Sequence, residues 1–164
     1  NMRISVVLAV VTPALFVAGP SLAAPRRHSL SGTWTFLESQ VTRRNGQVAP
    51  AHILFVDGAG FNCGAACTIV QDGRTLRVSR PEENGKKPRD IVLTFASSGT
   101  GAQSAHDGDA TAKWDGQQLL VTNSMGTMTI HQTIAVQKDR MIVTSQMTTG
   151  TTPGEIWRQT YVRR

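Results

Sequence analysis

The chain has 164 residues, which is enough for one domain rather than two. It carries 17 Lys and Arg against 11 Asp and Glu, and 40% of its residues are hydrophobic. This mixture is too hydrophobic for a disordered chain. Two cysteines are too few for a disulfide-framework miniprotein or a four-cysteine zinc site. The composition therefore indicates a single folded domain with a moderate excess of positive charge.

An apolar run at the amino end predicts a secretory signal peptide over residues 1–24. The run extends over residues 4–18 behind the basic Arg3, and its length of about 15 residues falls short of the roughly 20 that span a bilayer. Small residues follow it and place the cleavage near Ala23 or Ala24. We therefore expect a signal-peptide helix in the precursor and an exported mature chain, periplasmic or secreted.

The mature chain that remains after export is expected to consist of a short arm and one domain with a disulfide. Residues 25–30 are expected to form a basic N-terminal arm and residues 31–164 one domain, because no linker-like stretch divides the latter. No later segment is long and apolar enough to cross a membrane as a helix. In an oxidising compartment Cys63 and Cys67 are expected to form a local disulfide. A redox pair or a copper site is the alternative, but no βαβ pattern and no assignable histidine ligand support it.

The hydrophobic pattern of the mature chain alternates with a period of two, as in half-buried strands. The clearest runs are Trp34 to Phe36, Leu76 to Val78, Ile91 to Phe95, Met128 to Val136 and Trp157 to Tyr161. Turn sequences such as Asp115-Gly116 and Lys138-Asp139 separate them. About eight to ten strands joined mostly by short turns predict an all-β, antiparallel up-and-down barrel, because closure removes exposed edges. A two-sheet β-sandwich is the alternative.

The first strand opens with a distinctive segment, Ser31-Gly32-Thr33-Trp34, which contains Gly-x-Trp. Further hairpin segments are Trp114-Asp115-Gly116 and the closing Tyr161-Val162-Arg163. Together these segments resemble a group of small exported bacterial proteins of unknown function with lipocalin-like barrels. The resemblance implies that Trp34 plugs the closed end of the barrel. It also implies that an arginine of the last strand, Arg158 or Arg163, packs across the ring in a cation–π contact.

A barrel of this size just holds one small molecule among its inward side chains. Six side chains are expected to line that interior: Trp34, Phe36, Leu93, Phe95, Met128 and Ile130. The sequence therefore predicts a monomeric, exported protein that binds a small apolar molecule. The alternative is a purely structural barrel in which the same side chains fill a solid core.

Other function classes have less support in the sequence. The Ser-Gly-x-Trp opening also resembles small periplasmic metalloprotease inhibitors, which would make the arm at residues 25–28 the part that enters a protease cleft. No nucleophile elbow, phosphate loop or His-Glu-x-x-His occurs, so we expect neither an enzyme nor a cofactor or metal. Basic residues between Arg74 and Arg89 lie on both faces of a hairpin and are opposed by Glu82, Glu83 and Asp90. This pattern predicts a solvated basic hairpin and no nucleic-acid partner, with weak attraction to anionic lipid or polysaccharide as the alternative.

Overall fold

The structure is a computed structural model. It describes residues 29–54, 60–72, 75–83, 85–95, 102–104 and 109–164. The predicted signal peptide and residues 25–28 of the arm lie outside these ranges. All regular secondary structure in the described part is β-strand, which confirms the all-β class. No helix within those residues has the length and apolar character needed to cross a bilayer.

The described chain contains eleven strands. They are β1 (Gly32–Thr42), β2 (Val48–Pro50), β3 (Ala66–Asp72), β4 (Thr75–Arg80), β5 (Arg89–Phe95), β6 (Ala102–Ser104), β7 (Asp109–Asp115), β8 (Gln118–Met125), β9 (Met128–Gln137), β10 (Arg140–Thr149) and β11 (Thr152–Arg163). Consecutive strands from β3 to β11 pair with one another, and every pairing is antiparallel. The predicted turns at Asp115-Gly116 and Lys138-Asp139 connect β7 to β8 and β9 to β10.

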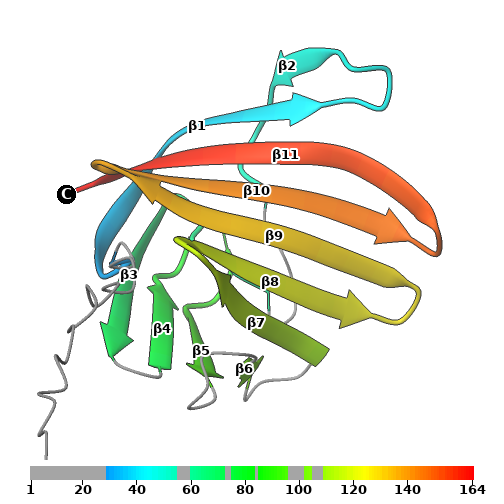
Figure 1. The fold of residues 1–164 in the computed structure, drawn as a ribbon. Coiled ribbons are helices and arrows are strands. Elements are labelled where there is room, and N and C mark those ends of the chain that lie inside the picture. Colours follow the sequence, from blue (N-terminus) through cyan, green and yellow to red (C-terminus); the bar gives the residue numbers. More distant parts are fainter. Residues whose placement is uncertain (1–28, 55–59, 73–74, 84, 96–101, 105–108) are drawn as a thin grey trace, which may run out of the picture.

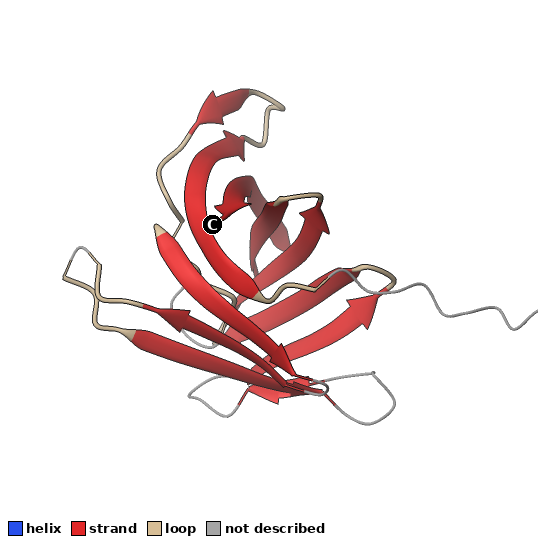
Figure 2. Ribbon diagram, turned by 90° about the vertical axis from the view of Figure 1, so that its left-hand side faces the viewer, coloured by secondary structure: helices blue, strands red, loops and turns tan. Residues whose placement is uncertain are grey.

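The sheet closes because β1 pairs with β3 on one side and with β11 on the other. The sheet forms a nearly closed antiparallel barrel of nine strands, which confirms the predicted up-and-down barrel rather than the sandwich. Strands β2 and β6 have three residues each, and β2 lies outside the ring against the last residues of β1. Figure 1 shows β1 curving away from β3 to run along β11. Figure 2 shows the same strands from the side, wrapped into a strongly curved sheet.

A register shift in β1 accompanies this curvature. Phe36 lies opposite Tyr161, but Glu38 lies opposite Thr160, so Leu37 is an extra residue on the β1 side of the pair. A bulge of this kind bends its strand and increases the local twist. The bend allows one strand to pair with β3 along its first residues and with β2 along its last.

Trp34 closes the narrow end of the barrel. Its ring is fully buried, and its Nε1–H donates a hydrogen bond of 2.8 Å to the carbonyl oxygen of Leu30. The guanidinium carbon of Arg163 lies 4.7 Å from the ring centroid, and Arg163 Nη2 donates to the carbonyl oxygen of Ser29 at 2.9 Å. Of the two arginines considered for this contact, Arg163 makes it. Arg158 is exposed on the outer face of β11, so its assignment to Trp34 was wrong.

The glycine of the Gly-x-Trp segment has a conformational role at this end. Gly32 has a φ of +140°, a conformation that residues with a side chain rarely adopt. A Cβ at this position would lie 3.5 Å from Arg163 Nε, which is ordinary van der Waals contact. The backbone conformation, rather than a lack of space beside Arg163, therefore favours glycine here.

Inward side chains of the ring strands form one hydrophobic core around Trp34. Leu76 and Val78 of β4 are buried, whereas Arg77 between them is exposed, as the alternation predicted. Other strands contribute Ile69, Ile91, Leu93, Leu119, Val121, Ile134, Met141 and Val143. Burial of each large aliphatic side chain contributes about 1.5–3 kcal/mol. The buried residues, Trp34 among them, therefore form one continuous hydrophobic core.

The role of Trp34 predicts a graded loss of stability on substitution. Trp34→Phe keeps most of the apolar volume but leaves the buried Leu30 carbonyl without its donor, which costs about 1–3 kcal/mol. Trp34→Ala should cost about 3–5 kcal/mol. Urea unfolding measures both values, with Trp157→Phe at a half-buried tryptophan as the control. Equal losses for the two Phe variants would show that the Leu30 bond contributes nothing.

Candidate functional site

The interior of the barrel holds a segment of the chain itself. Residues 60–64, between β2 and β3, are buried although they belong to no strand. Phe61 and Cys63 are each 2% exposed and are part of the hydrophobic core. A connecting segment usually runs over the surface, because its backbone polar groups need partners. This inner segment, residues 60–65, therefore depends on hydrogen bonds supplied from inside the barrel.

Gln132 of β9 supplies two of these hydrogen bonds. Its Oε1 accepts from the Phe61 backbone N–H at 2.7 Å, and its Nε2 donates to the Phe61 carbonyl oxygen at 2.9 Å. Nε2 also lies 3.2 Å from Ser145 Oγ on the neighbouring strand, to which it donates. The side-chain amide thus pairs with both polar groups of one residue, as a neighbouring strand would.

Sequence analysis did not identify Gln132. Its one available signal is its position, because Gln132 falls at an inward position of β9 between Ile130 and Ile134. A polar residue on the apolar face of a strand needs a buried partner. The partner is 71 residues away in sequence, and no local pattern connects the two positions.

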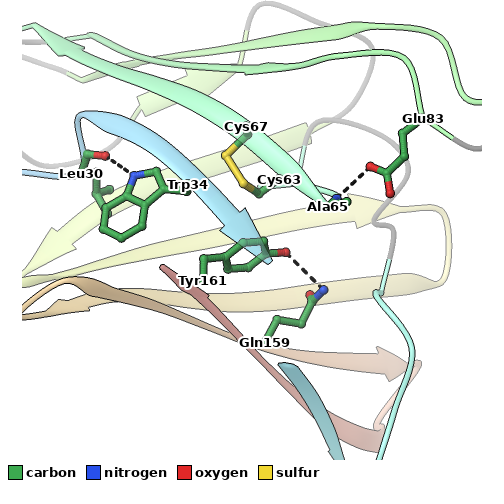
Figure 3. The surroundings of a disulfide bond; sticks show 8 residues. All are labelled: Leu30, Trp34, Cys63, Ala65, Cys67, Glu83, Gln159 and Tyr161. Carbon is green, nitrogen blue, oxygen red and sulfur yellow. Dashed lines mark hydrogen bonds between the residues drawn. A yellow bond between two sulfur atoms is a disulfide. The ribbon is translucent and has the colours of Figure 1, made fainter. Parts of the chain in front are cut away.

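The disulfide joins the inner segment to β3. Cys63 and Cys67 form the predicted bond, and the described chain contains no free cysteine. Cys67 lies opposite Trp34 in the β1–β3 pair, and both cysteines are 2% exposed. Figure 3 shows the bond on the inner side of the barrel together with Trp34 and Tyr161. The cysteines are only four positions apart in sequence. The bond therefore lowers the entropy of the unfolded chain only slightly and stabilises the fold by no more than about 2 kcal/mol.

Ala65 holds the end of the inner segment through its backbone. Its N–H donates to Glu83 Oε2 at 2.8 Å (Figure 3), and its carbonyl oxygen accepts from the Phe36 N–H at 2.8 Å. Glu83 belongs to the connection between β4 and β5, where its backbone pairs with that of Lys86. Two distant parts of the chain, β1 and the β4–β5 connection, therefore position this end.

Tyr161 packs beside the inner segment and is the single tyrosine of the chain. It is 2% exposed, its ring meets the Phe36 ring edge-on at 5.9 Å, and its hydroxyl oxygen accepts from Gln159 Nε2 at 3.3 Å. Burial raises the pKa of Tyr161 well above its ordinary value, and the negative charge of Glu83 raises that pKa further. The phenol is therefore neutral throughout the physiological range and contributes to the core as an apolar group.

The six predicted lining residues separate into two groups. Trp34 and Leu93 are 0% exposed within the core, and Phe36 packs against that core, so these three fill the narrow end. Met128 and Ile130 lie on β9 beyond Gln132, toward the opposite end. The side chain of Phe95 lies outside the described part of the structure.

Beyond the inner segment, the inward faces of β8, β9 and β10 carry methionines. Met125 lies opposite Met128, and Ile130 lies opposite Met147. Met147 is 38% exposed, Met125 and Met128 are half-buried, and Ile130 is 3% exposed. We call these four residues the methionine wall. Strands β8 to β11 project beyond β5 and β6 at this end, which we call the wide end (Figure 1).

The basic residues of the β4–β5 hairpin do not gather on one surface. Arg77 is exposed and lies 3.7 Å from Asp90, whereas Arg80 points inward, is 5% exposed and donates to the Lys87 carbonyl oxygen. Arg74 lies outside the described residues. The described arginines of this hairpin thus face opposite sides of the sheet, as the alternation predicted.

Neither comparison with known proteins nor metal-ligand geometry assigns a chemistry to the interior. No protein-family model, curated protein or solved structure matches the chain. Within the ranges that the structure covers, no three His, Cys, Asp or Glu residues are grouped so that they would hold a metal ion. The chemical character of the site therefore comes from the contacts described above.

Substitution of Gln132 tests whether it holds the inner segment. Gln132→Leu keeps the side-chain volume but leaves the Phe61 N–H and carbonyl buried without partners, so we expect a loss of about 2–3 kcal/mol in unfolding free energy. Gln137→Leu, at an exposed position of the same strand, should change it by less than about 0.5 kcal/mol. Urea unfolding compares the two, and equal effects would contradict the role of Gln132.

The single tyrosine provides a pH-dependent test of burial. The pKa of Tyr161 is higher in the folded protein than in the unfolded chain, where it is about 10. The contribution of Tyr161 to the free energy of unfolding is therefore complete below about pH 10. This contribution is lost as the pH rises through the folded-state pKa. At about pH 11 the native protein should therefore show no tyrosinate absorbance, whereas the urea-unfolded protein should show it. Titration of the native protein near pH 10 would contradict the buried position.

Proposed function

We propose that this protein is an exported binding protein that holds a small apolar molecule against the methionine wall. One observation carries the proposal: inward-facing apolar side chains from three adjacent strands remain accessible at the wide end, with Met147 38% exposed. Accessible apolar surface on the inner side of a curved sheet is typical of ligand sites. Methionine side chains adapt to ligands of different shape because they are unbranched and polarizable.

The inner segment would give this site its floor. Phe61 and the disulfide fill the interior below Ile130, and Gln132 already uses its amide on the Phe61 backbone. A ligand at this level meets an apolar wall above a floor in which the Gln132 amide is already paired with the Phe61 backbone. This arrangement favours an apolar molecule over one that needs several hydrogen bonds.

The proposed site is shallower than the sequence suggested. Of the predicted lining residues, Met128 and Ile130 belong to it, whereas Trp34, Phe36 and Leu93 belong to the filled narrow end. Trp157 of β11 is half-buried and lies opposite Ser145 of β10. Ser145 is the inward residue of β10 next to Met147, so the indole lies near the methionine wall. Its indole provides a fluorescence signal for an occupant of the wide end.

Two features support export and a lipocalin-like relationship as parts of the proposal. A buried disulfide is typical of proteins from oxidising compartments, which agrees with the apolar run before residue 24. The contact of Trp34 with Arg163 at the closed end agrees with the arrangement that the lipocalin-like resemblance implies. Both features bear on the kind of barrel, and neither identifies its ligand.

Binding of N-phenyl-1-naphthylamine, a neutral apolar fluorophore, tests the proposal. We expect saturable fluorescence enhancement with partial quenching of the tryptophan emission, to which Trp157 at the wide end contributes. Met128→Gln and Met147→Gln should each weaken binding about five- to tenfold, because each replaces apolar contact area by an amide. Val70→Gln is the matched control, since Val70 is 53% exposed on the outer face of β3.

Three outcomes decide between the functions considered. Loss of binding in the methionine variants alone, with unchanged urea midpoints, supports the wide-end site. Equal weakening by Val70→Gln would show that the probe adheres to exposed apolar surface in general. Absence of saturable binding would overturn the proposal and favour a purely structural barrel or a protein-binding role for the arm. Native mass spectrometry of the protein from an exporting host would then show whether any molecule is retained.

A further inference from the structure

A polar hollow lies on the outer face of the barrel, across β1, β11, β10 and the end of β9. Its volume is about 280 Å³, and its lining residues are Glu38, Gln40, Gln137, Arg140, Ile142, Arg158 and Thr160. Thr160 points away from the interior, because its neighbours Gln159 and Tyr161 face inward, yet Thr160 is only 7% exposed. The neighbouring side chains therefore rise around Thr160, which forms the floor of this outer hollow.

The bulge in β1 explains why the outer surface is concave here. The outside of a barrel is ordinarily convex, but the register shift between Phe36 and Glu38 bends β1 beside β11. After the shift, Glu38 lies opposite Thr160 and Gln40 lies opposite Arg158. The charged side chains are thereby placed on both sides of the hollow.

The charges of the outer hollow are not neutralised within the described chain. Arg140, Arg158 and Glu38 make no side-chain hydrogen bond or ion pair with other described residues. Two guanidinium groups face one carboxylate, so the hollow has a net positive charge. Guanidinium groups present several N–H donors in a plane, a geometry that matches phosphate and carboxylate oxygens.

A second, more apolar hollow continues along the same strands. It has a volume of about 440 Å³ and is lined by Thr42, Arg43, Arg44, Gln146, Thr152, Pro153, Gly154 and Ile156. Ile156 is 38% exposed and lies two residues before Arg158 on the same face of β11. Like the first hollow, it lies at a register shift, here between Gln146 and Thr148 of β10.

Gly154 sets the shape of the second hollow. A Cβ at Gly154 would lie 2.6 Å from the Met147 carbonyl oxygen, so only glycine allows this close approach of β11 to β10. Pro153 and Ile156 flank the glycine and provide apolar surface. Arg43 and Arg44 add positive charge at the side formed by the end of β1.

We propose that the outer hollow binds the oxyanion group, phosphate or carboxylate, of an amphiphilic molecule whose apolar part lies along Pro153 and Ile156. Arg140 and Arg158 bind the oxyanion, and the Thr160 hydroxyl donates to it from the floor. The lining of the two hollows contains no aromatic side chain on which a nucleic-acid base would stack. The same head group occurs on free amphiphiles and on membrane lipids, and the test below separates these sources.

Titration with octyl phosphate and with inorganic phosphate, followed by backbone amide chemical shifts, tests the site. We expect saturable shifts at Arg158, Thr160 and Ile156, and tighter binding of octyl phosphate because inorganic phosphate lacks an apolar part. Arg140→Gln and Arg158→Gln should each weaken binding about tenfold. Glu38→Gln should tighten it, because the substitution removes a negative charge from the hollow.

Arg77→Gln is the matched control for charge. It removes one positive charge from an exposed arginine of β4, so it should leave the affinity within about twofold. Equal weakening by Arg77→Gln would overturn the proposal in favour of general electrostatic attraction. Weaker binding after Glu38→Gln, or no saturable shifts in the unsubstituted protein, would overturn it as well. All four substitutions are at side chains that contribute little to the core, so the variants should fold.

Vesicles distinguish the two sources of the head group. Phosphatidylglycerol vesicles should retain the protein in sedimentation, and Arg158→Gln should abolish this retention, if the head group belongs to a membrane lipid. Binding of octyl phosphate without retention on vesicles assigns the site to a free amphiphile. Binding of N-phenyl-1-naphthylamine should be unchanged in Arg158→Gln, because Arg158 faces away from the methionine wall. The two measurements therefore test the proposal for the outer hollow and the proposal for the interior site independently.

Discussion

The pairing of β1 with both β3 and β11 is the constraint on which the other features depend. Without it, β1 and β11 would both present unpaired backbone groups at the edges of an open sheet. With it, Arg163 of the last strand lies opposite Trp34 of the first, and the two side chains close the narrow end together. The bulge at Leu37 bends β1 between the residues that pair with β3 and those that pair with β2, and the same bend shapes the outer surface beside Thr160.

A closed barrel creates an interior that the chain must fill, and this chain has only nine Phe, Trp and Tyr residues with which to do so. Part of the space is taken by the inner segment, which contributes Phe61 and the disulfide to the core. The burial of a large side chain such as Phe61 contributes about 1.5–3 kcal/mol, but an unpaired backbone group would cancel a similar amount. Gln132 removes that penalty, because its inward side chain on β9 pairs with both backbone groups of Phe61.

The two proposed sites use opposite faces of the same strands. In β11, Trp157 faces the interior while Arg158 faces the outer hollow. In β10, Met147 belongs to the methionine wall while Gln146 lines the second hollow outside. Because side chains alternate along a strand, neighbouring residues can serve an apolar site inside and a charged site outside. A shift of one residue in register would turn the inward side chains outward and the outward side chains inward. The bulges and the pairing of β1 with β11 fix the register and so keep each site on its own face.

The local features of this protein follow directly from its sequence. Alternating hydrophobicity and turn residues indicated the strands, and two cysteines four positions apart indicated a bond that needs only a short loop. For the proposed interior site, the same alternation placed Met128 and Ile130 on an inward face. It also placed Trp34 and Leu93 there, because a periodic pattern does not distinguish the filled end of a barrel from its accessible end.

Tertiary structure alone decided the features that depend on register and on contacts between distant segments. The choice of Arg163 over Arg158 follows from which residue of β11 lies opposite Trp34. The inner segment lies inside the barrel because the Phe61 backbone forms two hydrogen bonds with Gln132, which is 71 positions away in sequence. The outer hollow and the second hollow each lie at a register shift, one in β1 and one in β10. Local patterns specify which face a side chain occupies, whereas the closure of the sheet determines which side chains meet.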